Sequence, residues 1–132
     1  MLIFKPAFGI ATPWAYARLS AKASADKAAT APDSYLPAAQ AEARLAAWID
    51  RAKAPAEEIL FNNMEPPAFA KYLALPTLIE QLRRDFGLAP RMSGSGSACF
   101  ALLDEHIDSG PIIAAVRAAW GAAAFVIEGR LT

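Results

Sequence analysis

The sequence predicts a single α+β domain, a ferredoxin-like α/β sandwich in which helices pack on an antiparallel sheet. Three observations predict it. The chain has 132 residues, which is the usual size of one domain and short for two. Segments with the spacing of helices alternate with short apolar segments typical of strands. Two of these apolar segments flank a glycine-rich turn, the arrangement that an antiparallel pair of strands needs.

Composition and charge narrow the class of protein. The chain carries 13 basic and 13 acidic side chains, so its net charge is zero and it lacks the basic surface that duplex nucleic acid or an anionic membrane attracts. Its hydrophobic content of 55% argues against disorder. The 32 alanines add helix propensity more than core volume. We therefore expect a compact, helix-rich domain that binds neither nucleic acid nor membrane.

Targeting signals and reactive side chains are few. Cys99 is the only cysteine, so an intrachain disulfide and a Cys-x-x-Cys metal pair are both excluded. It lies in the apolar run 98–103, where a small buried hydrophobic residue is the better interpretation than a reactive thiol. His106 follows two acidic residues and is expected in a solvated loop, not as a metal ligand. No run of 18 apolar residues and no signal peptide is found, so a cytoplasmic protein is expected.

The N-terminal end predicts one strand and one helix. Residues 2–5 form an apolar strand that Pro6 ends. Thr12 is a predicted N-cap, because Pro13 follows it at the first helical position, where the missing N–H costs nothing. The helix that they open is expected over residues 13–19.

The middle of the chain predicts a loop and three helices. Residues 20–36 have almost no bulky side chain, which predicts a mobile loop with at most a marginal helical turn. Apolar residues then return at helical spacing, on a face made of Ala41, Leu45, Trp48, Ile49 and Ala52. A second helical segment follows Pro66 and Pro67 and carries Phe69, Tyr72 and Leu73. A third is predicted over residues 76–86, ends at Gly87 and has an apolar stripe of Leu75, Leu78, Ile79, Leu82 and Phe86.

The C-terminal end supplies the remaining strands. Residues 91–92 and 98–103 are predicted strands on the two sides of the glycine-rich turn. Residues 108–111 begin a fourth main helix that Gly121 interrupts, with inward side chains at Ile112, Ile113, Val116, Ala119 and Trp120. The chain closes on an alternation typical of a sheet with one wet side. One face of this last strand carries Phe125, Ile127 and Leu131, and the other carries Glu128 and Arg130.

The one unusual cluster is the turn formed by Ser93, Gly94, Ser95, Gly96 and Ser97. Two glycines one residue apart permit positive φ and close approach to backbone N–H groups, so such a turn can form a concavity that binds an anion. It is not a P-loop, because no Gly-Lys-Ser/Thr follows, and the third glycine of a dinucleotide fingerprint is missing. The plain alternative is a flexible hairpin connection, which periodicity alone favours.

Three stretches resemble a known family. Residues 90–103, PRMSGSGSACFALL, resemble the third conserved motif of the GHMP small-molecule kinases, MSGSGxxxFAL. Residues 5–16, KPAFGIATPWAY, and residues 61–67, FNNMEPP, resemble two stretches of those family members that act on a cytidine-diphosphate-linked methylerythritol. The stretches occur in the family's order. The resemblance covers only the C-terminal domain of such a kinase, so residues 1–132 are expected to be that single domain.

The resemblance implies an activity that needs a second domain. It implies transfer of the γ-phosphoryl group of ATP, with Mg²⁺, to the tertiary 2-hydroxyl of the cytidine-diphosphate-linked methylerythritol, in non-mevalonate isoprenoid (terpenoid) biosynthesis. In the family, the catalytic lysine and aspartate and the main ATP loop lie in an N-terminal domain, and none of them can be placed in this sequence. We therefore expect the isolated chain to be inactive and to bind no cofactor tightly. Its partner is expected to be the N-terminal kinase domain, and exposure of that interface invites self-association.

The resemblance also implies roles for a few residues. Thr12 and Tyr16 match the threonine and the aromatic residue that line the cytidine side of the family's substrate pocket. Stacking of a base on an aromatic ring contributes about 1–3 kcal/mol. The residues alone also fit a helix cap for Thr12 and a half-buried helix position for Tyr16. The five residues of the glycine turn match the third motif and are expected to support the substrate through backbone donors, and no catalytic residue is assigned to this chain.

Other polar residues have plainer interpretations. Asn62, Asn63 and Glu65 are expected to cap the helix that follows, and Asn63 departs from the family's aspartate. The basic residues Arg83 and Arg84 fit a solvated helix face, whereas the role of Arg91 stays open. Two alternative functions also stay open. One is a different GHMP kinase, acting on mevalonate, homoserine or a sugar, and the other is a stand-alone α+β module for binding or dimerisation.

Overall fold

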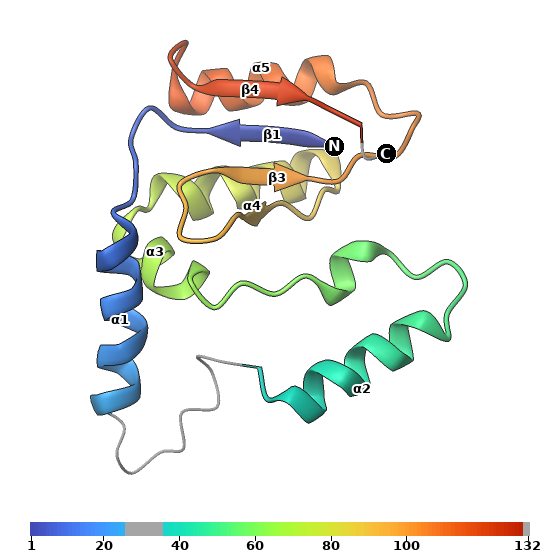
Figure 1. The fold of residues 1–132 in the computed structure, drawn as a ribbon. Helices are drawn as coiled ribbons and strands as arrows, with labels where there is room; N and C mark the ends of the chain where they lie inside the picture. The colour runs from blue at the N-terminus through green and yellow to red at the C-terminus, as the bar shows by residue number, and fades with distance from the viewer. Residues whose placement is uncertain (26–35, 131–132) are drawn as a thin grey trace.

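The computed structural model describes residues 1–25 and 36–130 of the chain. Figure 1 shows the described elements, which follow one another from the N-terminus as β1 (Leu2–Lys5), α1 (Thr12–Ala25), α2 (Ala38–Ile49), the 3₁₀ turn η1 (Ala56–Ile59), α3 (Glu65–Lys71), α4 (Ala74–Phe86), β2 (Arg91–Met92), β3 (Cys99–Ala101), α5 (Ser109–Trp120) and β4 (Phe125–Glu128).

The four strands form one antiparallel sheet in the order β2-β3-β1-β4. Phe4 of β1 lies opposite Cys99 on one side and Val126 on the other, which sets the register of the two central pairs. With α4 between β1 and β2, and α5 between β3 and β4, the chain has the β-α-β-β-α-β order of a ferredoxin-like fold. The predicted fold class is therefore confirmed. Helices α1, α2 and α3 are inserted between β1 and α4.

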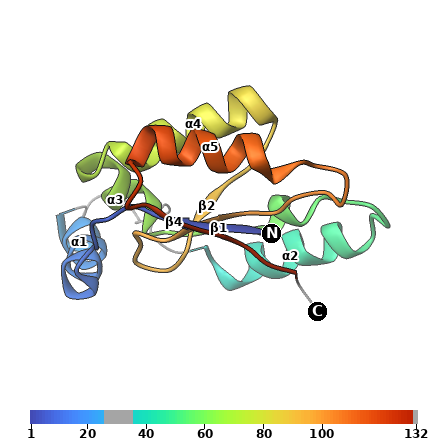
Figure 2. The ribbon, with the colours of Figure 1, turned by 90° about the horizontal axis from the view of Figure 1, so that it is seen from above.

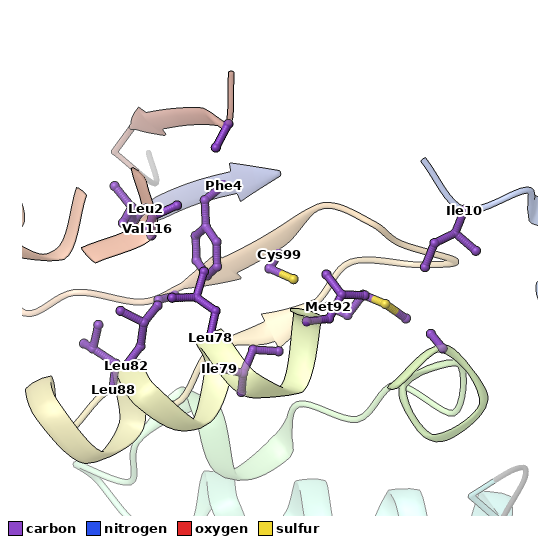
Figure 3. Close-up of a cluster of buried hydrophobic side chains, with 14 of the residues drawn as sticks. Leu2, Phe4, Ile10, Leu78, Ile79, Leu82, Leu88, Met92, Cys99 and Val116 are labelled. Atoms are coloured by element: carbon purple, nitrogen blue, oxygen red, sulfur yellow. The ribbon is translucent and has the colours of Figure 1, made fainter. Parts of the chain in front are cut away.

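The core lies between one face of the sheet and helices α4 and α5, which share that side in Figure 2. Alternate residues of β1 point into it, since Leu2 and Phe4 are fully buried while Lys5 is exposed. The buried residues of the two helices are Leu75, Leu78, Ile79 and Leu82 of the stripe predicted for α4, and Ile112 and Val116 of α5. Figure 3 shows part of this cluster, with Leu78, Ile79, Leu82 and Val116 labelled. Each such side chain contributes about 1.5–3 kcal/mol when fully buried.

The ends of these two helices have the predicted residues. Gly87 ends α4 with a φ of 67°, and its N–H donates to the carbonyl of Arg83. Asp108 caps α5, because its carboxylate accepts from the Gly110 N–H at 2.9 Å. The indole N–H of Trp120 donates to the carbonyl of Ala74 at 3.0 Å and so ties the end of α5 to the start of α4.

Helix α1 differs from the prediction at both ends. The Ala15 N–H donates to the carbonyl of Ala11, which puts the cap position at Ala11 and places Thr12 inside the helix. The helix extends to Ala25, so the prediction of a loop over residues 20–36 is wrong for residues 20–25. Alanine has the highest helix propensity, and the burial of Ala15 and Leu19 anchors the helix. The rest of the predicted loop, residues 26–35, lies outside the described residues.

Two apolar faces are covered less than the sequence predicts. On β4, Val126 packs against the core, whereas Phe125 and Ile127 are 55% and 49% exposed. The core-facing residues of β4 are thus the opposite set from the predicted one, because α4 and α5 occupy only one side of the sheet. Helix α2 forms as predicted but buries no residue, and its Leu45 and Ile49 are 46% and 64% exposed. Among residues 1–25 and 36–130, no helix has the length and apolar character needed to cross a membrane.

Cys99 is a fully buried core residue, as predicted. Burial, helped by the nearby charge of Glu65, raises the pKa of its thiol from 9.0 to about 12. The unfolded chain releases this proton near its ordinary pKa, whereas the folded chain holds it. The thiol therefore favours the folded state fully below pH 9.0, and this contribution is lost as the pH rises toward 12.

This pKa shift predicts a specific loss of stability in base. Between pH 8 and pH 10.5, the wild type should lose roughly 2 kcal/mol relative to Cys99→Ala, at about 1.4 kcal/mol for each pH unit above the ordinary pKa. Urea unfolding of both proteins at several pH values measures the difference in the free energy of unfolding. Because both proteins contain the same lysines and tyrosines, the effects of those groups cancel in this difference. Parallel pH profiles would contradict the prediction.

Candidate functional site

The glycine turn joins β2 to β3 at the end of the sheet nearest α1 and α3, on the left of Figure 1. The hydroxyl groups of Thr12 and Ser95 share a hydrogen bond of 2.9 Å there. Two stretches that are 83 residues apart in the sequence therefore meet. The hydroxyl of Thr12 bonds to the turn and does not serve as the predicted N-cap, so the capping prediction for this residue is wrong.

The turn is held in shape from inside. The Ser93 N–H donates to the carbonyl of Ala98 at 2.8 Å, and the Gly96 N–H donates back to the carbonyl of Ser93 at 3.0 Å. Gly94 and Gly96 have φ values of 54° and 85°, in the region that glycine adopts without strain. The loop is therefore a defined turn with two left-handed glycines, not a featureless connection.

The turn is anchored at Ser97, and two of its backbone N–H groups can donate to a ligand. The hydroxyl of Ser97, which is fully buried, donates to the carbonyl of Phe8 at 2.5 Å. Within the described part of the chain, the N–H groups of Gly94 and Ser95 donate to no protein acceptor. Together with the serine hydroxyls, these N–H groups can donate to a negatively charged ligand atom.

Asn62 braces the turn from the side of α3. Its amide nitrogen donates to the carbonyls of Met92 at 2.7 Å and Gly94 at 2.9 Å. Its amide oxygen accepts from the Met64 N–H at 2.9 Å. The cap position of α3 is occupied by Met64, without a side-chain cap bond, so the capping role predicted for Asn62, Asn63 and Glu65 is wrong. Asn62 instead connects the entry to α3 with β2 and the glycine turn.

Glu65 and Arg91 form the second brace. One carboxylate oxygen of Glu65 accepts from the Met92 N–H at 2.9 Å, and the other accepts from the Arg91 guanidinium at 3.0 Å. Glu65 is only 8% exposed, so its carboxylate is largely removed from water, whereas the Arg91 side chain is 35% exposed. The role that the sequence leaves open for Arg91 is thus a structural pair with Glu65. An acidic residue at the start of a mostly apolar helix is a sequence signal for a buried ion pair. The sequence does not identify its partner, which is 26 residues away.

Arg83 and Arg84 lie on helix α4 and pair with acidic residues of the same helix. Arg83 pairs with Glu80 at 2.6 Å and Arg84 pairs with Asp85 at 2.8 Å, all on the exposed side of α4. The hydrogen bond from Arg84 lowers the pKa of the Asp85 carboxyl below its ordinary value. The prediction of a solvated helix face for Arg83 and Arg84 is confirmed. His106 is likewise exposed in the loop before α5.

Tyr16 lies one helical turn after Thr12, on the same side of α1. Its side chain is 57% exposed, so its ring is open to a ligand. The other flank of α1 is fixed by Trp14, which packs edge-on against Tyr72 with ring centroids 5.6 Å apart. The Lys71 ammonium lies 4.3 Å from the Trp14 ring centroid. Helix α1 is therefore anchored to α3 on one flank and presents Thr12 and Tyr16 beside the glycine turn on another.

Comparisons with known proteins give matches over parts of the chain. Residues 40–122 match the family model described as "GHMP kinases C terminal". Among curated proteins, two relatives are named 4-diphosphocytidyl-2-C-methyl-D-erythritol kinase, from Bradyrhizobium sp. strains ORS 278 and BTAi1. They are 40% and 41% identical to this chain over 63 and 49 residues. These matches cover 45% and 36% of this chain, and only 21% and 16% of the relatives. No solved structure matches the chain.

Proposed function

The chain belongs to the C-terminal family of the GHMP kinases, and on that basis we propose that it is the C-terminal domain of a kinase that phosphorylates the 2-hydroxyl of 4-diphosphocytidyl-2-C-methyl-D-erythritol with ATP. The 2.9 Å bond between the hydroxyls of Thr12 and Ser95 carries the proposal. It joins the two candidate substrate positions on α1 to the glycine turn as one surface. The names of the two Bradyrhizobium relatives support the choice of substrate and of non-mevalonate isoprenoid biosynthesis as the setting.

Each part of this surface has a distinct task. The exposed ring of Tyr16 stacks on the cytosine base, which contributes about 1–3 kcal/mol. The hydroxyl of Thr12 exchanges its partner Ser95 for a polar atom of the nucleotide. The N–H groups of Gly94 and Ser95 donate to charged oxygens of the substrate. Phosphoryl transfer is mainly a matter of positioning and charge stabilisation, so a domain that only positions the substrate still contributes to the rate.

The catalytic groups are assigned to the rest of the kinase. In the described ranges, no three His, Cys, Asp or Glu side chains come together in a way that could hold a metal ion. We assign Mg²⁺, the main ATP loop and the base that acts on the accepting hydroxyl to an N-terminal domain, and the isolated chain is inactive. ATP supplies the phosphoryl group there.

A nucleotide titration tests the substrate assignment. The isolated chain should bind CMP, and Tyr16→Ala should weaken the binding roughly 5- to 150-fold, which corresponds to the loss of a stacked base. Phe125→Ala is the matched control, because Phe125 is equally exposed at 55% but lies on β4. The chemical shifts of α1 resonances during the titration give the dissociation constants.

Three results would contradict the proposal in different ways. If CMP does not bind, or binds equally well to Tyr16→Ala, the kinase acts on another substrate class of the family, such as mevalonate, homoserine or a sugar. If the purified chain alone phosphorylates the cytidine substrate, the assignment of the catalytic groups to another domain is wrong. If no GHMP kinase substrate or nucleotide binds, the chain is a stand-alone binding or dimerisation module.

A further inference from the structure

The side-chain amide of Asn62 holds two peptides of the glycine turn by their carbonyl groups. In the first peptide, the Met92 carbonyl accepts from Asn62 at 2.7 Å, and the Ser93 N–H on the opposite edge donates to the carbonyl of Ala98 at 2.8 Å. A trans peptide is planar, and its C=O and N–H point in opposite directions. Both edges of this peptide are therefore occupied, one by Asn62 and the other by Ala98.

The second peptide joins Gly94 to Ser95 and is held by one edge only. It is trans, and its carbonyl accepts from Asn62 at 2.9 Å. The Ser95 N–H therefore points away from Asn62, and it donates to no protein acceptor in the part of the chain that the structure describes. Asn62 thus sets the direction of one of the two free donors of the glycine turn.

The orientation of the Asn62 amide follows from its three partners. Its oxygen accepts from the Met64 N–H, which can only donate, and its nitrogen faces the Met92 and Gly94 carbonyls, which can only accept. A flipped amide would lose all three bonds. An aspartate at this position would keep an acceptor for Met64, but it would lose both donors and place a negative charge beside two carbonyl oxygens.

The backbone of the turn has an alternative in which this donor is lost. The Gly96 N–H donates to the carbonyl of Ser93 at 3.0 Å, which closes a four-residue turn with Gly94 and Ser95 at its centre. Gly94 has a φ of 54° and Ser95 a negative φ, the signs of a type II′ turn. A flip of the central peptide would give the signs of a type I′ turn. The Gly94 carbonyl would then replace the Ser95 N–H and repel a negatively charged ligand.

We propose that Asn62 is a positioning residue, which holds the Gly94 carbonyl and so keeps the Ser95 N–H directed toward a diphosphate group. This inference rests on the proposed function, in which the turn donates to charged oxygens of the substrate. In a cytidine-diphosphate-linked methylerythritol, the charged oxygens are those of the diphosphate. Asn62 itself contacts no substrate in this arrangement and acts through the turn.

A titration of the 132-residue chain with inorganic pyrophosphate is the first test, because pyrophosphate carries the charged oxygens without a cytosine base. The amide resonances of Gly94 and Ser95 should shift more than those of Ser93 and Gly96, whose N–H groups already donate within the turn. Equal shifts of all four resonances, or no shift of any, would overturn the proposal. The variant Tyr16→Ala should leave this titration unchanged, since it removes only the stacking ring.

Substitution of Asn62 is the second test. Asn62→Asp should weaken pyrophosphate binding about tenfold or more, the loss expected for one hydrogen bond to a charged group. The residual dipolar coupling of the Ser95 N–H should change in this variant, because the peptide is no longer held. Asn63→Asp is the matched control, since it adds the same charge at the neighbouring position, which is also half-buried. This control should bind pyrophosphate as the wild type does.

Each outcome of these substitutions has a distinct meaning. Equal pyrophosphate affinity of Asn62→Asp and the wild type would show that the backbone alone holds the peptide, and equal losses in Asn62→Asp and Asn63→Asp would assign the effect to charge alone. Either result contradicts the role of Asn62. If Asn62→Asp does not fold, Asn62→Ala gives the same comparison and should also lose pyrophosphate binding.

The inference and the proposed function fail separately. A chain that binds pyrophosphate through Asn62 and the turn, but binds CMP equally well with and without the Tyr16 ring, contradicts the cytidine substrate and leaves the role of Asn62 intact. A chain that binds CMP through Tyr16, but whose pyrophosphate affinity does not depend on Asn62, contradicts only the role of Asn62.

Discussion

Gly96→Ala should lower the free energy of unfolding by about 3 kcal/mol, because it combines backbone strain with overpacking, each of which costs about 1–3 kcal/mol. Gly96 has a φ of 85°, a conformation that an alanine adopts only with strain. A Cβ at this position would lie 2.7 Å from the sulfur of Met92 and 2.8 Å from the Cδ1 of Ile10. Both neighbours are core residues, exposed by 1% and 7%, so they have little room to move.

Two other glycines separate these effects. Gly94 also has a positive φ, but a Cβ there meets nothing within 4 Å, so Gly94→Ala should cost only the strain, roughly 1–2 kcal/mol. Gly9 has open space and no positive φ, and Gly9→Ala should be close to neutral. Urea unfolding of the three variants gives the comparison. If Gly96→Ala lowers the free energy of unfolding no more than Gly94→Ala does, the prediction that close packing at Gly96 adds to the backbone strain is wrong.

Glu65→Ala should lower the free energy of unfolding by about 2–3 kcal/mol, because a largely buried ion pair loses one partner and a buried N–H loses its acceptor. The carboxylate of Glu65 serves both the Arg91 guanidinium and the Met92 N–H. The Arg91 side chain is 35% exposed, so water solvates part of its charge, which holds the expected loss below that of a fully buried pair. Glu65→Gln retains an acceptor for Met92 and should lose about half as much.

Glu80→Ala is the control for this prediction. Glu80 also pairs with an arginine, but its side chain and that of Arg83 are 64% and 51% exposed. Exposed pairs contribute about 0–1 kcal/mol, so this variant should lie close to the wild type. Chemical unfolding of the three variants under the same conditions tests the contrast. Equal losses for Glu65→Ala and Glu80→Ala would show that the Glu65–Arg91 brace does not hold β2 and the turn in place.

Much of the fold was predictable because its signals are local. The buried stripe of α4 and its end at Gly87 follow from helical spacing and a terminal glycine, and the start of α5 follows from the cap at Asp108. The strands on either side of the glycine turn are predictable for the same reason. Each of these depends on residues within a few positions of one another. Propensity, periodicity and caps therefore determine them with little help from the rest of the chain.

The candidate site was predictable in part. Matched motifs named Thr12, Tyr16 and the glycine turn, but no local pattern could show that the hydroxyls of Thr12 and Ser95 meet. The sequence predicts Asn62 and Glu65 as helix caps, whereas both bond to β2. A polar residue at the start of a helix has the same sequence pattern in either role. Which role it takes depends on whether a strand from elsewhere lies within hydrogen-bond reach.

Local patterns in the sequence are enough to specify the fold class, the order of the elements, the buried stripe of α4 and the residues of the turn. Contacts between distant segments determine which face of β4 is covered, what α2 packs on, and that Glu65 pairs with Arg91. These features depend on residues that are far apart in the sequence, which local patterns cannot specify. A sheet has two faces, and alternation along β4 cannot specify which of them two helices will cover. An ion pair across 26 residues exists only after the chain has closed around its core.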